Sequence, residues 1–182
     1  GKVDDHFNGA MRAIYSSSVP TVARVNGAAA GGGFGLALAC DIAVAAKNAF
    51  FVATFGPKLG IVPDLGTTWN LPHKAGRARA LGLAMLGDRI TAEQAEAWGL
   101  IWKAVEDDQL DSEIELITKK LARTSADAMT RIRSVTDAAL DNSFSDQLDL
   151  EMEHQAVLIP KNMTEGARAF MEKREPEFPG RN

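Results

Sequence analysis

The sequence predicts an α/β fold in which a parallel β-α-β unit is followed by a helical tail. Two apolar strand patterns, at residues 21–25 and 41–46, flank an alanine-rich helix pattern at residues 34–40. A strand, a helix and a strand in this order indicate two parallel strands joined by a crossover helix. The patterns from residue 107 onward are all helical. A chain of 182 residues is long enough for one domain with a sizeable core.

The other elements are expected from periodicity and from turn residues. Their expected ranges are a helix over 7–15, a strand over 49–53, a helix over 65–86 that breaks at Pro72 and restarts at Gly76, a helix over 92–98, a strand over 101–105, and helices from 112 and over 126–140, 145–158 and 164–174. Residues 55–64 hold two glycines and two prolines and should form an exposed loop. The pairs Thr91/Gln94 and Ser112/Glu115 match the capping box and predict two helix N-termini.

The composition is that of an ordinary globular protein, with 46% hydrophobic and 24% charged residues. The net charge of -4 and the lack of a long basic run argue against nucleic acid as a partner. The beginning of the sequence lacks the order of a signal peptide, and the most apolar run, residues 27–40, is shorter than the ~20 residues that span a bilayer. We therefore expect a cytoplasmic protein without membrane contact.

Cysteine and histidine give no sign of a redox or metal site. Cys40 is the single cysteine, which excludes an internal disulfide, and its apolar helix pattern predicts a buried structural thiol. His6, His73 and His154 are too scattered to suggest metal ligands. We expect no metal and no redox cofactor.

A glycine triplet, Gly31, Gly32 and Gly33, stands directly before the helix pattern at 34–40. The first N–H groups of a helix have no partner inside it and lie at the positive end of its dipole, so they favour an anion or a developing oxyanion. Tight packing of the helix on a sheet is the alternative reason for such a cluster. Neither the dinucleotide fingerprint nor the Gly-Lys-Ser/Thr phosphate loop is present.

The wider sequence around this triplet resembles a known signature. The order Asn26-Gly27-x-Ala29-x-Gly31-Gly32-Gly33, followed by Leu36-Ala37 and Cys40-Asp41, is similar to that of the crotonase (enoyl-CoA hydratase/isomerase) superfamily. The resemblance implies an acyl-CoA thioester as substrate, with coenzyme A present only as part of it. It also implies that the N–H of Gly32 is one of two that hold the thioester oxygen. The further substrate contacts that it implies are Ala30, Gly31, Gly33, Pro63 and Leu65.

The resemblance extends to the organisation of the chain. It implies a ββα spiral core over residues 1–106 and a C-terminal helical region over 107–182 that assembles a homotrimer or homohexamer. The superfamily has further N-terminal strands that have no match in this sequence, so a partial core is expected. Phe170 and Lys173 match an aromatic residue and a lysine that reach the CoA nucleotide of a neighbouring subunit; plain packing is the alternative for Phe170.

The candidate acid/base is Asp64, directly after Pro63. Hydratases of the superfamily hold a water molecule with two glutamates, but Gly35 and Gly56 occupy the matching positions here, whereas its isomerases carry an aspartate where this chain has Asp64. Apolar neighbours such as Ile61 would bury the carboxylate and raise its pKa. The alternative role for Asp64 is that of an N-cap for the helix that follows.

The resemblance is most detailed to the isomerases of aerobic phenylacetate breakdown. It lies in Gly60-Ile61-Val62-Pro63-Asp64, Trp69-x-Leu71-Pro72, Ala75-Gly76-Arg77-Ala78-Arg79-Ala80, Ala92-Glu93-Gln94-Ala95, Trp98-Gly99-x-Ile101-Trp102 and Gln147-Leu148-Asp149-Leu150-Glu151. It implies an isomerase that converts a ring-1,2-epoxyphenylacetyl-CoA to its oxepin form. The alternatives are an enoyl-CoA hydratase, another enoyl-CoA isomerase, or a CoA-binding assembly subunit without activity.

Overall fold

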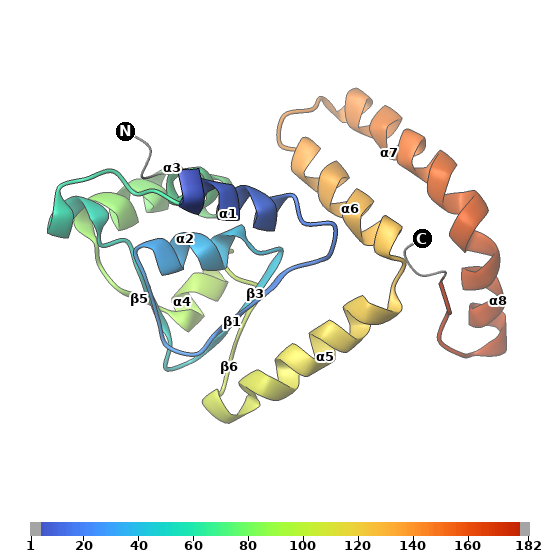
Figure 1. Ribbon diagram of the computed structural model, residues 1–182, viewed down its shortest axis with the longest axis horizontal. Coiled ribbons are helices and arrows are strands. Elements are labelled where there is room, and N and C mark those ends of the chain that lie inside the picture. The colour runs from blue at the N-terminus through green and yellow to red at the C-terminus, as the bar shows by residue number, and fades with distance from the viewer. Residues whose placement is uncertain (1–4, 179–182) are drawn as a thin grey trace. The chain divides into compact units, whose positions relative to one another are not determined.

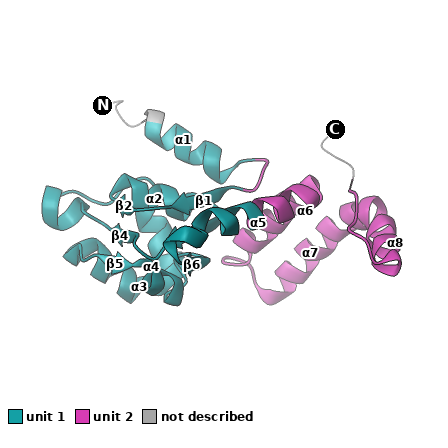
Figure 2. Cartoon of the chain, turned by 90° about the horizontal axis from the view of Figure 1, so that it is seen from below, with its two compact units in different colours: residues 1–17, 21–116 teal, residues 18–20, 117–182 magenta. Residues whose placement is uncertain are grey.

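The computed structural model describes residues 5–178, with side chains from Phe7 onward. The chain divides into two compact units, shown in two colours in Figure 2. The first unit contains residues 1–17 and 21–116, and the second contains residues 18–20 and 117–182. The boundary falls within a helix, and the division that we expected after residue 106 stays a prediction.

The helices and strands of the described part carry the labels of Figures 1 and 2. They are α1 (Asp5–Tyr15), β1 (Val22–Val25), β2 (Ala28–Ala30), α2 (Gly32–Ala39), β3 (Ile42–Ala46), β4 (Phe50–Val52), α3 (Thr67–Leu86), β5 (Ile90–Thr91), α4 (Ala92–Ala97), β6 (Lys103–Val105), α5 (Leu110–Arg123), α6 (Ala126–Ala138), α7 (Phe144–Leu158) and α8 (Thr164–Glu172). Phe55–Leu59 and Ile159–Met163 are π-helical turns, and Asp107–Gln109 is a 3₁₀ turn.

The first unit contains two small sheets of three strands each. In one, β1, β3 and β6 are parallel in that order, with Val22 opposite Ile42 and Val44 opposite Lys103. In the other, β2 is parallel to β4, and β4 is antiparallel to β5. Helix α2 lies between β1 and β3 in the chain and packs against β1 and β2 (Figure 2). The predicted parallel unit is confirmed, with β1 and β2 each at the edge of its sheet among the described strands.

The core of this unit lies where α2 packs against α3 and against strands β1 and β2. Phe34 of α2 and Phe51 of β4 are fully buried, and their ring centroids are 5.3 Å apart. Leu38 and Leu71 bring the two helices into the same cluster. Because burial of such side chains contributes about 1.5–3 kcal/mol each, this cluster holds α2 firmly in place.

Several expected boundaries are wrong. The long helix breaks at Gly76, where φ is 78° and ψ is 161°, whereas Pro72 lies inside the helix. Glycine takes this extended positive-φ backbone without the clash that a β-carbon would cause. Helix α5 begins at Leu110, directly after the 3₁₀ turn, so Ser112 lies inside the helix and its hydroxyl donates to the Gln109 carbonyl at 2.9 Å. The capping box at Thr91 is confirmed.

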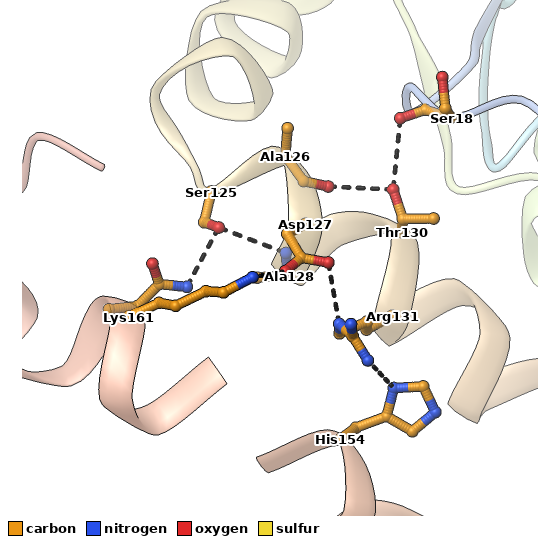
Figure 3. A network of polar contacts seen from close by, with 10 residues as sticks. Ser18, Ser125, Ala126, Asp127, Ala128, Thr130, Arg131, His154 and Lys161 are labelled. Atoms are coloured by element: carbon orange, nitrogen blue, oxygen red, sulfur yellow. Dashed lines mark hydrogen bonds and ion pairs between the residues drawn. The ribbon is translucent and has the colours of Figure 1, made fainter. Parts of the chain in front are cut away.

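The second unit is built from the end of α5, from α6, α7 and α8, and from the π-helical turn Ile159–Met163. Figure 3 shows a polar network, centred on Asp127, that joins α6, α7 and this π-helical turn. Its carboxylate accepts from Arg131 at 2.8 Å and from Lys161 at 3.2 Å, and these bonds lower its pKa. Arg131 also donates to Nδ1 of His154 at 3.2 Å, which links α6 to α7.

Candidate functional site

The glycine triplet forms the N-terminus of α2, as its sequence predicts. Gly31 is buried with a φ of 53°, and its N–H donates to the Val52 carbonyl of β4 at 2.9 Å. The Gly31 carbonyl accepts the Phe34 N–H at 3.0 Å, which begins the helical hydrogen bonds. The N–H groups of Gly32 and Gly33 therefore stand in the first turn, where a helix supplies no acceptor for them. Their positive partial charge suits an anionic oxygen.

Asp64 lies at the start of a tight turn that precedes α3. Leu65 and Gly66 both have positive φ, 50° and 73°, and the Thr67 N–H donates to the Asp64 carbonyl at 2.9 Å. This combination defines a type I′ turn. For a leucine the left-handed backbone costs about 1–2 kcal/mol. The Gly66 carbonyl accepts from the backbone N–H of Asn70 at 2.8 Å and from its side-chain amide at 3.0 Å, which fastens the turn to α3.

The side chain of Leu65 joins this turn to α2. A β-carbon placed on Gly32 would lie 2.6 Å from Cδ1 of Leu65, and one placed on Gly35 would lie 3.1 Å from its Cβ. Real contacts to a β-carbon are longer than the first of these, so Leu65 fills the space that a side chain at residue 32 would need. The structure therefore brings the turn of Asp64 against the first turn of α2.

The environment expected for Asp64 differs from that in the structure. Its side chain is exposed, and Ile61, Val62 and Trp69 are themselves 50%, 75% and 44% exposed, so the expected burial is wrong for the described residues. The alternative role as an N-cap is wrong as well, because Gly66 occupies the N-cap position of α3 and no capping side chain accepts an N–H of its first turn. Within residues 5–178 the Asp64 carboxylate has no hydrogen bond or ion pair, and its backbone alone is tied down.

The positions that match the water-holding glutamates cannot hold any side chain in this backbone. A β-carbon on Gly35 would lie 2.6 Å from the carbonyl oxygen of Leu65 and 2.7 Å from Oγ1 of Thr67. A β-carbon on Gly56 would lie 2.8 Å from the carbonyl oxygen of Ala84. The two carbonyl oxygens belong to the backbone. They cannot move away by a rotamer change, as the end of a side chain could.

The remaining candidates lie in different parts of the chain. Ala30 is exposed at the end of β2, and Pro63 is half-buried. Phe170 and Lys173 belong to the second unit, where Phe170 is 85% exposed, so packing within the described chain does not explain it. Lys173 ends α8 with a φ of 53° and donates its N–H to the Phe170 carbonyl at 3.3 Å.

Sequence reasoning missed a groove on the other side of α2. It has a volume of about 620 Å³ and is lined by residues 22–29 of β1 and β2 and by Gly33, Leu36, Ala37 and Cys40. The short strand β2 has no strand signal in its sequence, so the groove that it lines together with β1 could not be expected. Cys40 is only half-buried rather than buried, and this burial raises the pKa of its thiol.

The described residues show neither a metal site nor a membrane span. Among residues 5–178 there is no group of three or more His, Cys, Asp or Glu side chains that could ligate a metal ion. In the same part of the chain, each helix is too short or too polar to cross a bilayer. The expectation that no cofactor takes part stays a prediction.

Comparison with known proteins assigns the family. The family model described as Enoyl-CoA hydratase/isomerase matches residues 2–181. The chain belongs to the enoyl-CoA hydratase/isomerase family. This confirms the resemblance drawn from the glycine triplet and the Asp64 segment.

Similar members of this family are named as isomerases or as hydratases. The 1,2-epoxyphenylacetyl-CoA isomerase of Escherichia coli (strain K12) is 41% identical over 180 residues, which are 98% of this chain and 68% of that protein. A probable enoyl-CoA hydratase of Rhodobacter capsulatus is also 41% identical, over 97% of this chain and 69% of its own length. The chain thus spans about two thirds of each of these relatives.

Solved structures of the family confirm the fold. An enoyl-CoA hydratase from Polaromonas sp. JS666 superposes with a TM-score of 0.90 at 35% identity, over 96% of this chain and 68% of that one. A putative enoyl-CoA hydratase/isomerase from Mycobacterium abscessus gives a TM-score of 0.91 at 30% identity, over 98% and 69% of the two chains. The crotonase-type α/β fold is therefore established, with about a third of each neighbour lying outside the match.

Proposed function

We propose that this chain is an acyl-CoA isomerase in which Asp64 is the single acid/base and the Gly32 N–H helps to hold the thioester oxygen. The substrate that we propose is a ring-1,2-epoxyphenylacetyl-CoA, converted to its oxepin isomer. The name of the 41% identical relative from Escherichia coli supports this choice of acyl group. The contact of Leu65 with Gly32 supports the pairing of the two groups in one site.

The main support for the proposal is that positions 35 and 56 have no room for a side chain. Addition of water to a double bond needs a positioned water and a proton donor, which hydratases of this family hold with two carboxylates. At Gly35 the Leu65 carbonyl leaves no room for a β-carbon, and at Gly56 the Ala84 carbonyl has the same effect. The turn that lies against the first turn of α2 carries one carboxylate, Asp64, and one carboxylate suffices to remove a proton and return it elsewhere.

The chemistry of each group follows from its position. Removal of a proton beside a thioester places negative charge on the thioester oxygen, and an N–H at the start of a helix stabilises that charge. Asp64, whose exposed side chain makes no hydrogen bond within residues 5–178, takes the proton and returns it to another carbon or oxygen of the substrate. The atoms of substrate and product are the same, so no water and no further cofactor are consumed.

A hydratase is the second candidate, since the relative from Rhodobacter capsulatus bears that name. Another enoyl-CoA isomerase and an inactive CoA-binding subunit are the remaining alternatives. Each predicts a different product or none, so they can be separated by assay.

We also propose a homotrimer or homohexamer in the cytoplasm, in which Phe170 and Lys173 contact the CoA nucleotide held by a neighbouring subunit. The exposure of Phe170 supports this, because an aromatic ring that is 85% exposed is available to a partner. The same holds for Met171, which is 78% exposed on the same helix.

The test is turnover of the ring epoxide and of simple enoyl-CoA thioesters by the wild type, by Asp64→Asn and by Asp88→Asn. The amide cannot accept the proton, so a loss of at least ~100-fold in kcat is expected for Asp64→Asn. Asp88 is an exposed aspartate of the same unit and serves as the matched control, for which wild-type turnover is expected. Equal turnover by Asp64→Asn and the wild type would contradict the proposed role.

A further inference from the structure

The backbone of the Asp64 turn is one that a leucine does not favour by itself. Type I′ turns place glycine, asparagine or aspartate at their central positions, because a bulky side chain crowds the left-handed backbone. Leu65 nevertheless has a φ of 50° here. Such a residue persists only where its surroundings hold it, and these residues gather at functional sites.

Two contacts hold the turn that contains Leu65. The side chain of Leu65 rests on α2, over the two glycines at 32 and 35, which have no β-carbon to push it away. At the next residue of the turn, Asn70, only 5% exposed, binds the Gly66 carbonyl through both its backbone and its side-chain amide. Leu65 therefore adjoins Asp64 in the chain and lies against Gly32 in space.

We infer that Leu65 is a positioning residue that sets the Asp64 carboxylate relative to the Gly32 N–H. Its left-handed backbone sets the direction of the Asp64 side chain. The packing of its side chain over Gly32 and Gly35, here called the Leu65 seat, fixes how closely the turn approaches α2. This inference rests on the proposed function, in which those two groups act on one substrate. Gly32 is then glycine for a second reason besides its N–H, because a β-carbon there would displace Leu65.

The first test compares kcat and KM of Leu65→Ala, Leu65→Asn and Leu65→Met. Alanine removes the methyl groups that pack over Gly32 and Gly35, so the Asp64 carboxylate is displaced. This is expected to lower kcat by about 10- to 100-fold while KM stays within about 3-fold of the wild-type value. Asparagine tolerates the left-handed backbone, so the turn should fold, but it cannot fill the apolar seat, and the same loss is expected. Methionine refills the seat and should restore kcat to within about 3-fold of the wild type. Leu86→Ala, at a leucine 67% exposed, is the matched control with wild-type kcat.

The second test uses Gly32→Ala, which keeps the N–H and adds only a β-carbon. The atom in its way is Cδ1 of Leu65, the movable end of a side chain, so the protein should fold with Leu65 displaced and kcat lowered. In the double variant Gly32→Ala/Leu65→Ala that collision is gone. Its kcat is therefore expected to equal that of Leu65→Ala alone, and its melting temperature to fall less than the sum of the two single losses.

The outcomes separate this inference from the proposed function. If Asp64→Asn is inactive but Leu65→Ala and Leu65→Asn keep wild-type kcat, the positioning role is wrong and the function stands. If the losses of Gly32→Ala and Leu65→Ala multiply in the double variant, the two residues act independently and the positioning role is again wrong. If Asp64→Asn is fully active, the proposed function itself fails.

Discussion

Thr67 shows how tightly the turn and α2 are packed together. It is fully buried, and its Oγ1 is the one buried side-chain nitrogen or oxygen of the described residues that has no hydrogen-bond partner. That oxygen lies 2.7 Å from the place of a β-carbon on Gly35, so it helps to close this position. A buried hydroxyl without a partner costs about 1–3 kcal/mol, which this site tolerates.

Replacing Thr67 with valine should stabilise the first unit. Valine has nearly the same shape and removes the unpaired hydroxyl, so the free energy of unfolding is expected to rise by about 1 kcal/mol, or ~2–4 °C in melting temperature. Thr67→Ser keeps the hydroxyl and loses the methyl group, so it should be less stable than the wild type. Calorimetry of the three proteins measures this order, and a destabilised Thr67→Val would show that the hydroxyl has a partner.

At the scale of elements, α8 and the segment after it are held by one acidic residue. Glu165 in the first turn of α8 accepts from Nη1 of Arg174 at 2.7 Å and from Nη2 at 3.1 Å, and also from the Glu177 N–H at 2.9 Å. The Arg174 bonds are the larger cause and the Glu177 bond the next, and together they lower the pKa of Glu165 from 4.5 to about 2. Both ends of the segment 165–177 are thus tied to one carboxylate.

The bonds of Glu165 to Arg174 and Glu177, here called the Glu165 clamp, predict how the stability of this segment depends on pH. A folded pKa below the unfolded one means that the contribution of Glu165 to stability is complete above about pH 4.5 and is lost as the pH falls toward 2. Titration of the Glu165 side chain by NMR should give a midpoint near 2 in the wild type. Arg174→Gln should move the midpoint up toward 4.5, whereas Arg168→Gln removes the smallest of the causes and should leave it nearly unchanged. Equal midpoints in the wild type and Arg174→Gln would contradict the clamp.

Elements with local signals could be predicted from the sequence. Ser125 and Ser143 cap α6 and α7 by accepting from N–H groups three residues ahead, which is a signal that the sequence itself carries. Strand β2 consists of three alanines and forms only because β4 pairs with it, so no local pattern could reveal it.

The site divides in the same way. Gly32 and Asp64 were candidates through the family resemblance, since their motifs are contiguous. The seat of Leu65 and the closure of Gly35 depend on the approach of α3 to α2, which joins residues about thirty positions apart and has no local signal. No turn was predicted at this place, because the helix was expected to begin at residue 65.

At the scale of the whole molecule, the two units have different roles in our proposal. The first holds the candidate acid/base and the helix N-terminus, and the second carries large apolar side chains on its surface, such as Phe144, Met152, Phe170 and Met171, all at least 66% exposed. Exposed apolar side chains in this number favour contact with further subunits. Each is available to a second copy of the chain.

The mass of the proposed assembly can be measured in solution. Light scattering of the purified protein should give three or six times the mass of one chain. Phe170→Asp with Met171→Asp places two charges in the proposed contact and should lower that mass, whereas Met85→Asp with Leu86→Asp in the first unit, on side chains 67% exposed, is the control. A single-chain mass for the wild type would contradict the proposed trimer.

The most direct test of the central claim is to follow the oxygen of the solvent during turnover. The wild type would convert the ring epoxide and a simple enoyl-CoA in heavy-oxygen water, with the product masses read by mass spectrometry. Our account has Asp64 as the one acid/base, and positions 35 and 56 have no room for carboxylates that could hold a water molecule. It therefore predicts an isomeric product without heavy oxygen. A product that carries heavy oxygen as a hydroxyl group would contradict isomerisation and identify the chain as a hydratase.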